Sequence, residues 1–251
     1  MRLLQLQDDG DFSLVEHMGG GVPPYAILSH TWGSDNDEVT CRDLIKGKGN
    51  DKTGYRKLTF CGKQAAKDGL EFFWVDTCCI DKSSSTELTE AINSMFRWYQ
   101  NAVKCYVYLS DVSTKERSRS SDLLWELAFK SSRWFTRGWT LQELLAPSHV
   151  EFFSVEGILL GDKSSLKSQI HEITRIPIDA LQGRSPLMYS IMERFKWAER
   201  RRTKIQEDKV YSLLGLFDIH MPLIYGEGFQ NAFRRLCREA NTHSSHLSNG
   251  E

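Results

Sequence analysis

The feature of this sequence that most restricts its fold is the alternation of short apolar runs with helical segments in the first 155 residues. Each of the four apolar runs is compact, as expected for a buried strand. The strand-like runs cover residues 25–29, 72–76, 105–109 and 149–153, and the helical segments cover 54–68, 86–101 and 138–145. Strand–helix alternation of this kind is typical of a parallel sheet with right-handed crossovers. We therefore predict an α/β fold, with a mostly parallel sheet flanked by helices.

The strand signal fades after about residue 160, and only helical patterns follow. These patterns cover residues 166–173, 190–199, 207–216 and 229–240. We predict one domain over residues 1–240, with an α/β core at about 20–155 and a helical extension at 160–240. The polar residues 241–251 are expected to form a flexible tail or linker.

Composition excludes several classes of protein. The 32 basic and 33 acidic residues leave a net charge of −1, whereas nucleic-acid binders usually carry a basic excess. No stretch approaches the roughly 18 consecutive apolar residues of a membrane span. The six cysteines form no C-x-x-C pair, so they are expected to be free thiols in a reducing, cytoplasmic location rather than zinc ligands. We therefore expect no nucleic-acid partner, no membrane span and no metal centre.

Polar and aromatic side chains follow the first two predicted strands. Ser29, His30, Trp32 and Gly33 lie at the end of the first. Because ligands of open α/β sheets bind beyond the carboxyl ends of the strands, these residues are candidates for binding a planar ligand. The alternative is that Trp32 covers an edge of the core and Gly33 makes a turn.

Asp76 ends the second strand-like run, and Cys78 follows two residues later. The Asp76 carboxylate is suited to binding a ribose hydroxyl. Cys78 is a candidate nucleophile if His30 lies beside it, since a thiolate needs a base or a positive field. The alternative for Cys78 is inert packing in the core.

Trp139 and Glu143 stand four residues apart and therefore share one face of a helix. A carboxylate beside an indole is partly desolvated, and its charge then acts through a lower dielectric. The alternative is a surface glutamate on an amphipathic helix whose tryptophan packs inward. Glu143 is thus a candidate catalytic group that spacing alone does not establish.

The C-terminal part carries two weaker signals. The basic run 200–204 precedes Glu207 and Asp208, which favours a structural ion-pair network. Gly226 and Gly228 precede the last helix, where they form either a tight turn or an anion site built from backbone N–H groups. The common nucleotide-binding and metalloprotease motifs are absent from the sequence.

Five ordered blocks carry a family resemblance. They are YAILSHTWG (25–33), FFWVDTCCIDK (72–82), ELTEAINSMFRWYQNAVKCYVYLSDV (87–112), SRWFTRGWTLQELLAP (132–147) and EDKVYSLLGLFDIHMPLIYGEG (207–228). Together they resemble the fungal heterokaryon incompatibility (HET) domain. The strongest likeness is to the N-terminal effector domain of incompatibility proteins that also carry a NACHT module and WD repeats. The resemblance implies programmed cell death after non-self recognition, with those downstream modules as partners.

HET domains are more remotely similar to TIR domains. Residues 25–29 and 72–76 correspond to the first two TIR strands, and Trp139 to Leu144 resembles the TIR pattern W-C-x-x-E-L, with Thr140 in place of the cysteine. In TIR domains that cleave NAD the glutamate of this pattern is catalytic, so the resemblance implies that Glu143 is catalytic. It implies an NAD glycohydrolase without a cofactor, active when the chain self-associates, with NAD or a related nucleotide as substrate.

Two other functions remain open at this point. A TIR-like domain that is not an enzyme signals by self-association, and clustering then recruits a partner. A thiol hydrolase built from Cys78 and His30 requires that these side chains approach hydrogen-bond distance.

Overall fold

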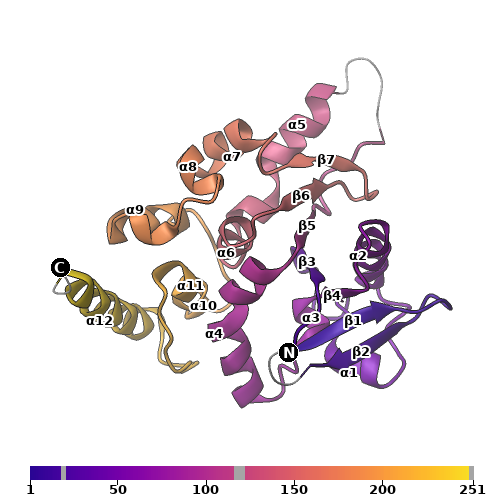
Figure 1. Cartoon of the computed structure of the whole chain (residues 1–251), viewed down its shortest axis with the longest axis horizontal. Helices are drawn as coiled ribbons and strands as arrows, with labels where there is room; N and C mark the ends of the chain where they lie inside the picture. Colours follow the sequence, from indigo (N-terminus) through magenta and orange to yellow (C-terminus); the bar gives the residue numbers. More distant parts are fainter. Residues whose placement is uncertain (18–20, 116–121, 249–251) are drawn as a thin grey trace.

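The computed structural model describes residues 1–17, 21–115 and 122–248, and these residues contain one seven-stranded sheet (Figure 1). The strands are β1 Arg2–Leu6, β2 Phe12–Glu16, β3 Tyr25–His30, β4 Phe72–Trp74, β5 Lys104–Tyr108, β6 Val150–Phe153 and β7 Leu159–Asp162. Their order in the sheet is β2-β1-β4-β3-β5-β6-β7. The four central strands are parallel, whereas β1, β2 and β7 pair antiparallel to their neighbours. The α/β class is therefore confirmed, and the sheet is mixed at both edges.

The N-terminal hairpin of β1 and β2 was not predicted, because its sequence lacks the alternation of a half-exposed strand. Leu3 and Leu4 are adjacent in β1, yet both are fully buried. β1 lies between β2 and β4, and helices approach the sheet there, so neighbouring side chains are covered on both faces. The core of the sheet thus begins at residue 2 rather than near residue 20.

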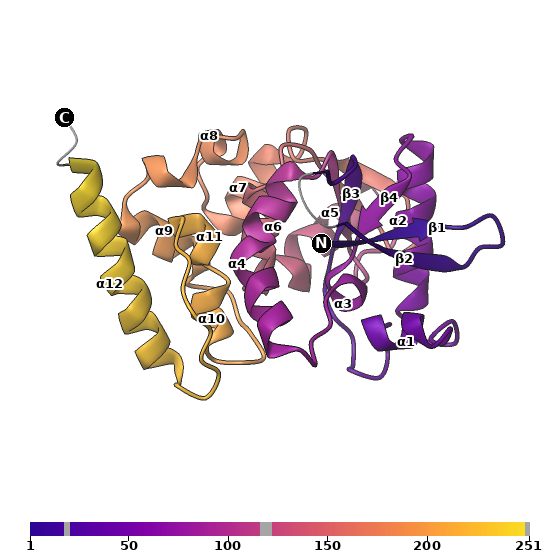
Figure 2. The ribbon, with the colours of Figure 1, turned by 60° about the horizontal axis from the view of Figure 1, so that its bottom comes forward.

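Helices cover both faces of the sheet. They are α1 Cys41–Ile45, α2 Tyr55–Lys67, α3 Asp76–Cys79, α4 Ser85–Asn101, α5 Asp122–Ser131, α6 Thr140–Leu145, α7 Lys167–Thr174, α8 Ile178–Leu181, α9 Ile191–Ala198, α10 Asp208–Tyr211, α11 Leu214–Phe217 and α12 Phe229–Ser248, with 3₁₀ turns at Arg133–Thr136 and Pro186–Met188. β4 lies beside β3 on one side in the sheet, and the chain then crosses back over β3 to form β5 on its other side. Right-handed crossovers in opposite directions place α2 and α4 on opposite faces, as Figure 2 shows.

The helical extension docks on α4. Gly215 in α11 lies against Phe96 of α4 so closely that a Cβ at residue 215 would stand 2.1 Å from the Phe96 Cβ. No side chain fits in that space, so a glycine is required for this contact. Figure 2 shows α9 to α12 beyond α4, on the side away from the sheet. The extension is therefore packed on the core and is not a separate body.

Two predicted helices differ from the structure. The segment 207–216 forms two short helices, α10 and α11, instead of one. The last helix, predicted to end at residue 240, continues to Ser248. Residues 241–248 of the predicted tail are therefore helical, and residues 249–251 lie outside the described part of the chain.

Candidate functional site

A cavity of about 470 Å³ opens at the carboxyl edge of the parallel strands. It is lined by His30, Trp32, Asp35, Asp76, Ile80, Lys82, Leu88, Ile92, Met95, Tyr99, Arg137, Trp139, Thr140, Glu143, Lys204, Ile205, Asp208 and Tyr225. The sheet edge, α4 and α6 form one wall of the cavity, and the helical extension forms the other wall. The position next to β3, where the strand order turns, is the usual ligand site of open α/β sheets.

Five of the eight residues singled out in the sequence line this cavity: His30, Trp32, Asp76, Trp139 and Glu143. Glu143 in α6 is only 8% exposed. The Ser29 hydroxyl donates a hydrogen bond to Glu143 Oε2, and Trp134 Nε1 donates to Ser29 Oγ over 2.7 Å. The indole nitrogen can only donate, so it takes one acceptor site of the Ser29 oxygen and leaves the serine proton available to the glutamate. Ser29 thus lies behind Glu143 and orients it, without lining the cavity itself.

Burial raises the pKa of Glu143 from its ordinary 4.5 to about 8. The Ser29 hydrogen bond and the charge of Arg201 lower this pKa in part, whereas the charge of Asp76 raises it. A carboxyl group with such a pKa is mostly protonated at neutral pH. A cation that enters the cavity favours the ionised form.

Two buried cations hold α6 at its ends. Arg201 Nη1 donates to the Arg137 carbonyl at 2.9 Å and to Thr140 Oγ1 at 2.8 Å, at the start of the helix. Lys163 Nζ donates to the carbonyls of Leu144 and Pro147, at its end. These contacts satisfy helix-terminal groups that would otherwise stay unpaired in the interior. Glu143 is therefore carried on a short helix fixed at both ends.

His30 stands between two carboxylates on the floor of the cavity. Its Nε2 is 3.6 Å from Glu38 Oε2, and its Nδ1 is 4.0 Å from Asp76 Oδ1. Lys57 Nζ contacts Glu38 Oε1 at 2.5 Å. Burial alone would raise the pKa of Glu38, but the hydrogen bond and charge of His30 and of Lys57 outweigh it and lower the pKa to about 2. Glu38 is thus a fixed anion behind the imidazole.

Aromatic side chains form the outer wall. Lys82 Nζ lies 3.6 Å from the centre of a Trp32 ring and 3.6 Å from Asp76 Oδ2. On the opposite side the Tyr225 hydroxyl donates to Asp208 Oδ1 at 2.9 Å. Burial raises the pKa of Asp208 above its usual value, although hydrogen bonds from Tyr225 and Trp139 act in the other direction.

Gly33 and Cys78 do not line the cavity. The Gly33 N–H donates to Glu38 Oε1 at 2.6 Å, so this residue supports the floor from behind. Cys78 is fully buried, and its thiol donates to the Val39 carbonyl at 3.2 Å. Burial raises its pKa well above the ordinary value, which keeps it a thiol. No hydrogen bond joins Cys78 to His30 among the described residues, so the geometry gives a thiol hydrolase no support.

The predicted ion-pair network of the basic run 200–204 is wrong. Arg201 points inward to α6, and Lys204 pairs with Asp35 at 2.8 Å instead of with Glu207 or Asp208. The Glu207 carboxylate instead accepts the N–H groups of Gly226 and Gly228, at 2.9 and 2.8 Å. The anion bound by these glycines is thus the chain's own glutamate, and this contact holds the loop that brings Tyr225 to the cavity.

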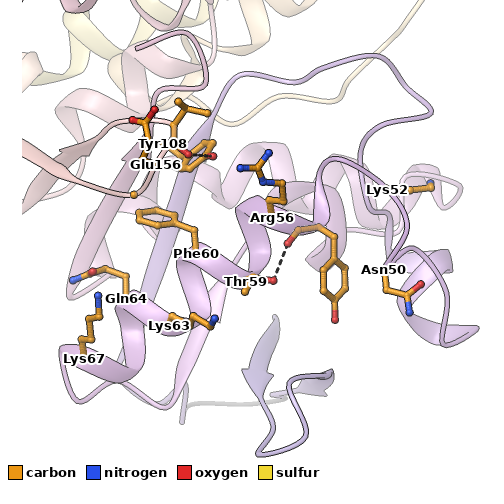
Figure 3. A pocket seen from close by; sticks show the side chains of 13 residues that line it. Asn50, Lys52, Arg56, Thr59, Phe60, Lys63, Gln64, Lys67, Tyr108 and Glu156 are labelled. Carbon is orange, nitrogen blue, oxygen red and sulfur yellow. Dashed lines mark hydrogen bonds between the residues drawn. The ribbon is translucent and has the colours of Figure 1, made fainter. Parts of the chain in front are cut away.

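A second cavity, of about 410 Å³, lies over α2 and has a different character. Figure 3 shows Arg56, Lys63 and Lys67 on α2, with Glu156 nearby. Burial is the largest single influence on Glu156 and raises its pKa, but hydrogen bonds from residues including Ser113 and Ser154 together outweigh it and lower the pKa to about 2. That carboxylate is fully engaged in a turn, so this groove has no group comparable to Glu143.

The structure adds residues to the candidate site that the sequence did not point to: Arg137, Arg201, Asp208 and Tyr225. Arg137, Asp208 and Tyr225 line the cavity, whereas Arg201 lies behind it and holds α6. Local patterns indicate only a helix, a loop or a charged surface at these residues, and the packing of the extension on the core is what positions Arg201, Asp208 and Tyr225. No three His, Cys, Asp or Glu side chains of the described residues are placed to hold a metal ion. In the same part of the chain, no helix combines the length and apolar character needed to cross a bilayer.

Comparison with known proteins confirms the family resemblance. Residues 25–130 match the profile of the family described as Heterokaryon incompatibility protein (HET). The chain is 56% identical to the vegetative incompatibility protein HET-E-1 of Podospora anserina over 238 residues, which are 94% of this chain and 18% of that protein. The chain thus spans less than a fifth of this relative. No solved structure matches it.

Proposed function

Since the chain carries a heterokaryon incompatibility domain, we propose that it is the cell-death effector of a vegetative incompatibility protein and that it hydrolyses NAD when clustered. Its partners are then copies of itself and the NACHT and WD-repeat modules of a full-length protein. The bond cleaved is the one between nicotinamide and ribose. The observation that carries this proposal is the buried Glu143, held by Ser29 in a cavity at the carboxyl edge of the sheet.

The cavity offers what this reaction needs. The nicotinamide of NAD is already cationic, so it leaves as a neutral pyridine when the electrons of the glycosidic bond pass to its ring nitrogen. Water then adds to the ribose carbon and releases one proton, which leaves ADP-ribose. The ribose is oxocarbenium-like in the transition state, and a fixed carboxylate stabilises that positive charge by about 2–4 kcal/mol.

The raised pKa of Glu143 fits this role. The cationic ring attracts the ionised form of the carboxyl group, so substrate binding favours the anion where it is needed. Asp76 and His30 stand beside it to bind ribose hydroxyls, and Trp32 or Trp139 flanks the base. No metal or cofactor takes part in this scheme.

The arrangement of the sheet supports the TIR-like part of the proposal. The four parallel strands lie in the sheet in the order β4-β3-β5-β6. When they are numbered 1 to 4 along the chain, this order is 2-1-3-4, which is the flavodoxin-like order. Thr140 replaces the cysteine of the TIR pattern, and its hydroxyl donates to the Trp134 carbonyl at 2.6 Å while accepting from Arg201. The residue at this position therefore serves to hold the helix that carries Glu143.

The test is nicotinamide release by clustered protein. The chain is fused to an oligomeric scaffold, incubated with NAD and analysed by chromatography, with Glu143→Gln and the exposed α4 residue Glu90→Gln as matched variants. We expect release by the wild type and by Glu90→Gln, and a loss of at least about 30-fold in Glu143→Gln. Cell killing by clustered protein that releases no nicotinamide would instead establish signalling by assembly.

A further inference from the structure

We propose that Arg137, together with Lys204, binds a phosphate group of the ligand, so that the cavity selects a phosphate-bearing nucleotide over the free nucleoside. The inference rests on the proposed function for the reaction that follows, but it concerns a separate subsite. Both residues line the same cavity as Glu143, on the wall that includes the helical extension.

Arg137 is a half-buried cation with an unused side chain. Within residues 1–17, 21–115 and 122–248, no hydrogen bond or ion pair engages its guanidinium group. Its backbone, by contrast, is fixed, because its carbonyl accepts from Arg201 Nη1 at 2.9 Å and its N–H donates to the Trp134 carbonyl at 3.3 Å. A guanidinium on an anchored backbone, with its donors free toward a cavity, is prepared for an anion.

Lys204 reaches the cavity from the segment paired with that of Arg137. The Arg202 N–H donates to the Thr136 carbonyl at 2.7 Å, and the Gly138 N–H donates to the Arg202 carbonyl at 2.9 Å. Lys204 contacts Asp35, whose side chain is 87% exposed. An ion pair so exposed contributes little to stability, so Lys204 can readily leave Asp35 to contact a phosphate group.

The distribution of charge along the wall identifies the ligand. Glu143 and Asp76 present carboxyl groups at the sheet edge, where a cationic ring fits. The two other carboxyl groups of the lining have partners, since Asp35 pairs with Lys204 and Asp208 accepts from the Tyr225 hydroxyl. The third cation of the lining, Lys82, is already placed over Trp32 and near Asp76. Arg137 and Lys204 are the cations left for an anionic part of the same ligand. A molecule with a cationic base at one end and a phosphate group further along satisfies both ends.

The experiment measures binding without turnover. In the Glu143→Gln background, calorimetry gives the dissociation constants of NAD and of nicotinamide riboside, which lacks the phosphates. We expect Arg137→Ala to weaken NAD binding about 10- to 100-fold and to leave nicotinamide riboside within about twofold, because only NAD loses a charge-assisted contact. Arg137→Lys should recover part of the affinity. Arg200→Ala, which removes an exposed charge outside the cavity, should change neither constant.

Three results overturn the inference: an unchanged NAD constant in Arg137→Ala, an equal loss for both ligands, or no NAD binding by the parent protein. The outcome is separable from that of the proposed function. NAD binding through Arg137 without nicotinamide release by clustered wild type removes the hydrolase and keeps the phosphate subsite. Nicotinamide release by clustered wild type, together with an NAD affinity that Arg137→Ala does not change, keeps the hydrolase and removes the phosphate subsite.

Discussion

The buried Glu143 should make the protein less stable as the pH rises, and Glu143→Gln should remove this effect. In the folded protein the pKa of Glu143 is about 8, against an ordinary 4.5. Between these values the unfolded chain ionises while the folded protein keeps its proton, so the free energy of unfolding falls with increasing pH. Each pKa unit corresponds to about 1.4 kcal/mol, which makes the cost roughly 3 kcal/mol at pH 7 and below about 1 kcal/mol at pH 5.

The groups around Glu143 support this direction. Burial is the largest influence on the pKa and Asp76 adds a like charge, whereas the hydrogen bonds of Ser29 and Tyr99 and the charge of Arg201 offset only part of the rise. The glutamine amide keeps the acceptor for the Ser29 hydroxyl and carries no charge. Glu143→Gln should therefore be more stable than wild type by a margin that grows by about 2–3 kcal/mol from pH 5 to pH 7.

Urea unfolding followed by tryptophan fluorescence at pH 5, 6, 7 and 8 measures this margin. Glu156→Gln is the matched control, because hydrogen bonds from residues such as Ser113 and Ser154 outweigh burial and lower the folded pKa of Glu156 to about 2. Its contribution is present above pH 4.5 and is lost only as the pH falls toward 2, so this variant should be destabilised by a constant amount over the same range. A margin for Glu143→Gln that does not change with pH refutes the raised pKa.

Three further outcomes follow from the same contacts. If the Glu143 anion is the active form, kcat/KM for nicotinamide release rises with pH and levels off above about 8, as an assay across buffers would show. Ser29→Ala removes a hydrogen bond that favours the anion, so the midpoint of that pH profile should move up by about one unit. Gly215→Ala forces a Cβ into Phe96 and should lower the thermal midpoint by several degrees, measured by circular dichroism. The same substitution at the exposed Gly21, where an added Cβ meets no atom within 4 Å, should leave the midpoint nearly unchanged.

The sequence predicted those parts of the fold that depend on local patterns. β3 and β4 are apolar runs with a polar residue at or just beyond their ends, and this pattern alone placed His30 and Asp76 near a ligand site, although the predicted strand 72–76 ends at Trp74 and Asp76 begins α3. Glu143 was predicted as a candidate from its spacing to Trp139 and from a family resemblance. The partners that set its chemistry are distant in sequence: Ser29 is 114 residues away. Periodicity shows that a face is buried, but not what it is buried against.

The same reasoning explains why the extension was not predicted to belong to the site. Its segment 207–216 reads as an amphipathic helix, and its charges read as a surface network. In the structure Asp208 and Tyr225 instead form a wall of the cavity, and Arg201 holds the start of α6 through Thr140. These contacts depend on the fit of Gly215 against α4, which no local pattern reveals.

The site therefore crosses the division between core and extension. The family profile covers residues 25–130, which include Ser29, His30 and Asp76, but Glu143 lies beyond it. Glu143 is oriented by Ser29 from inside that range and stands on a helix that Arg201 fixes from outside it. A core cut off near residue 155 would keep the carboxylate but lose Arg201, Lys204 and the wall formed by Asp208 and Tyr225. The helical extension is thus as much a part of the candidate site as the strand ends, because it holds the helix that carries Glu143 and forms a wall of the cavity.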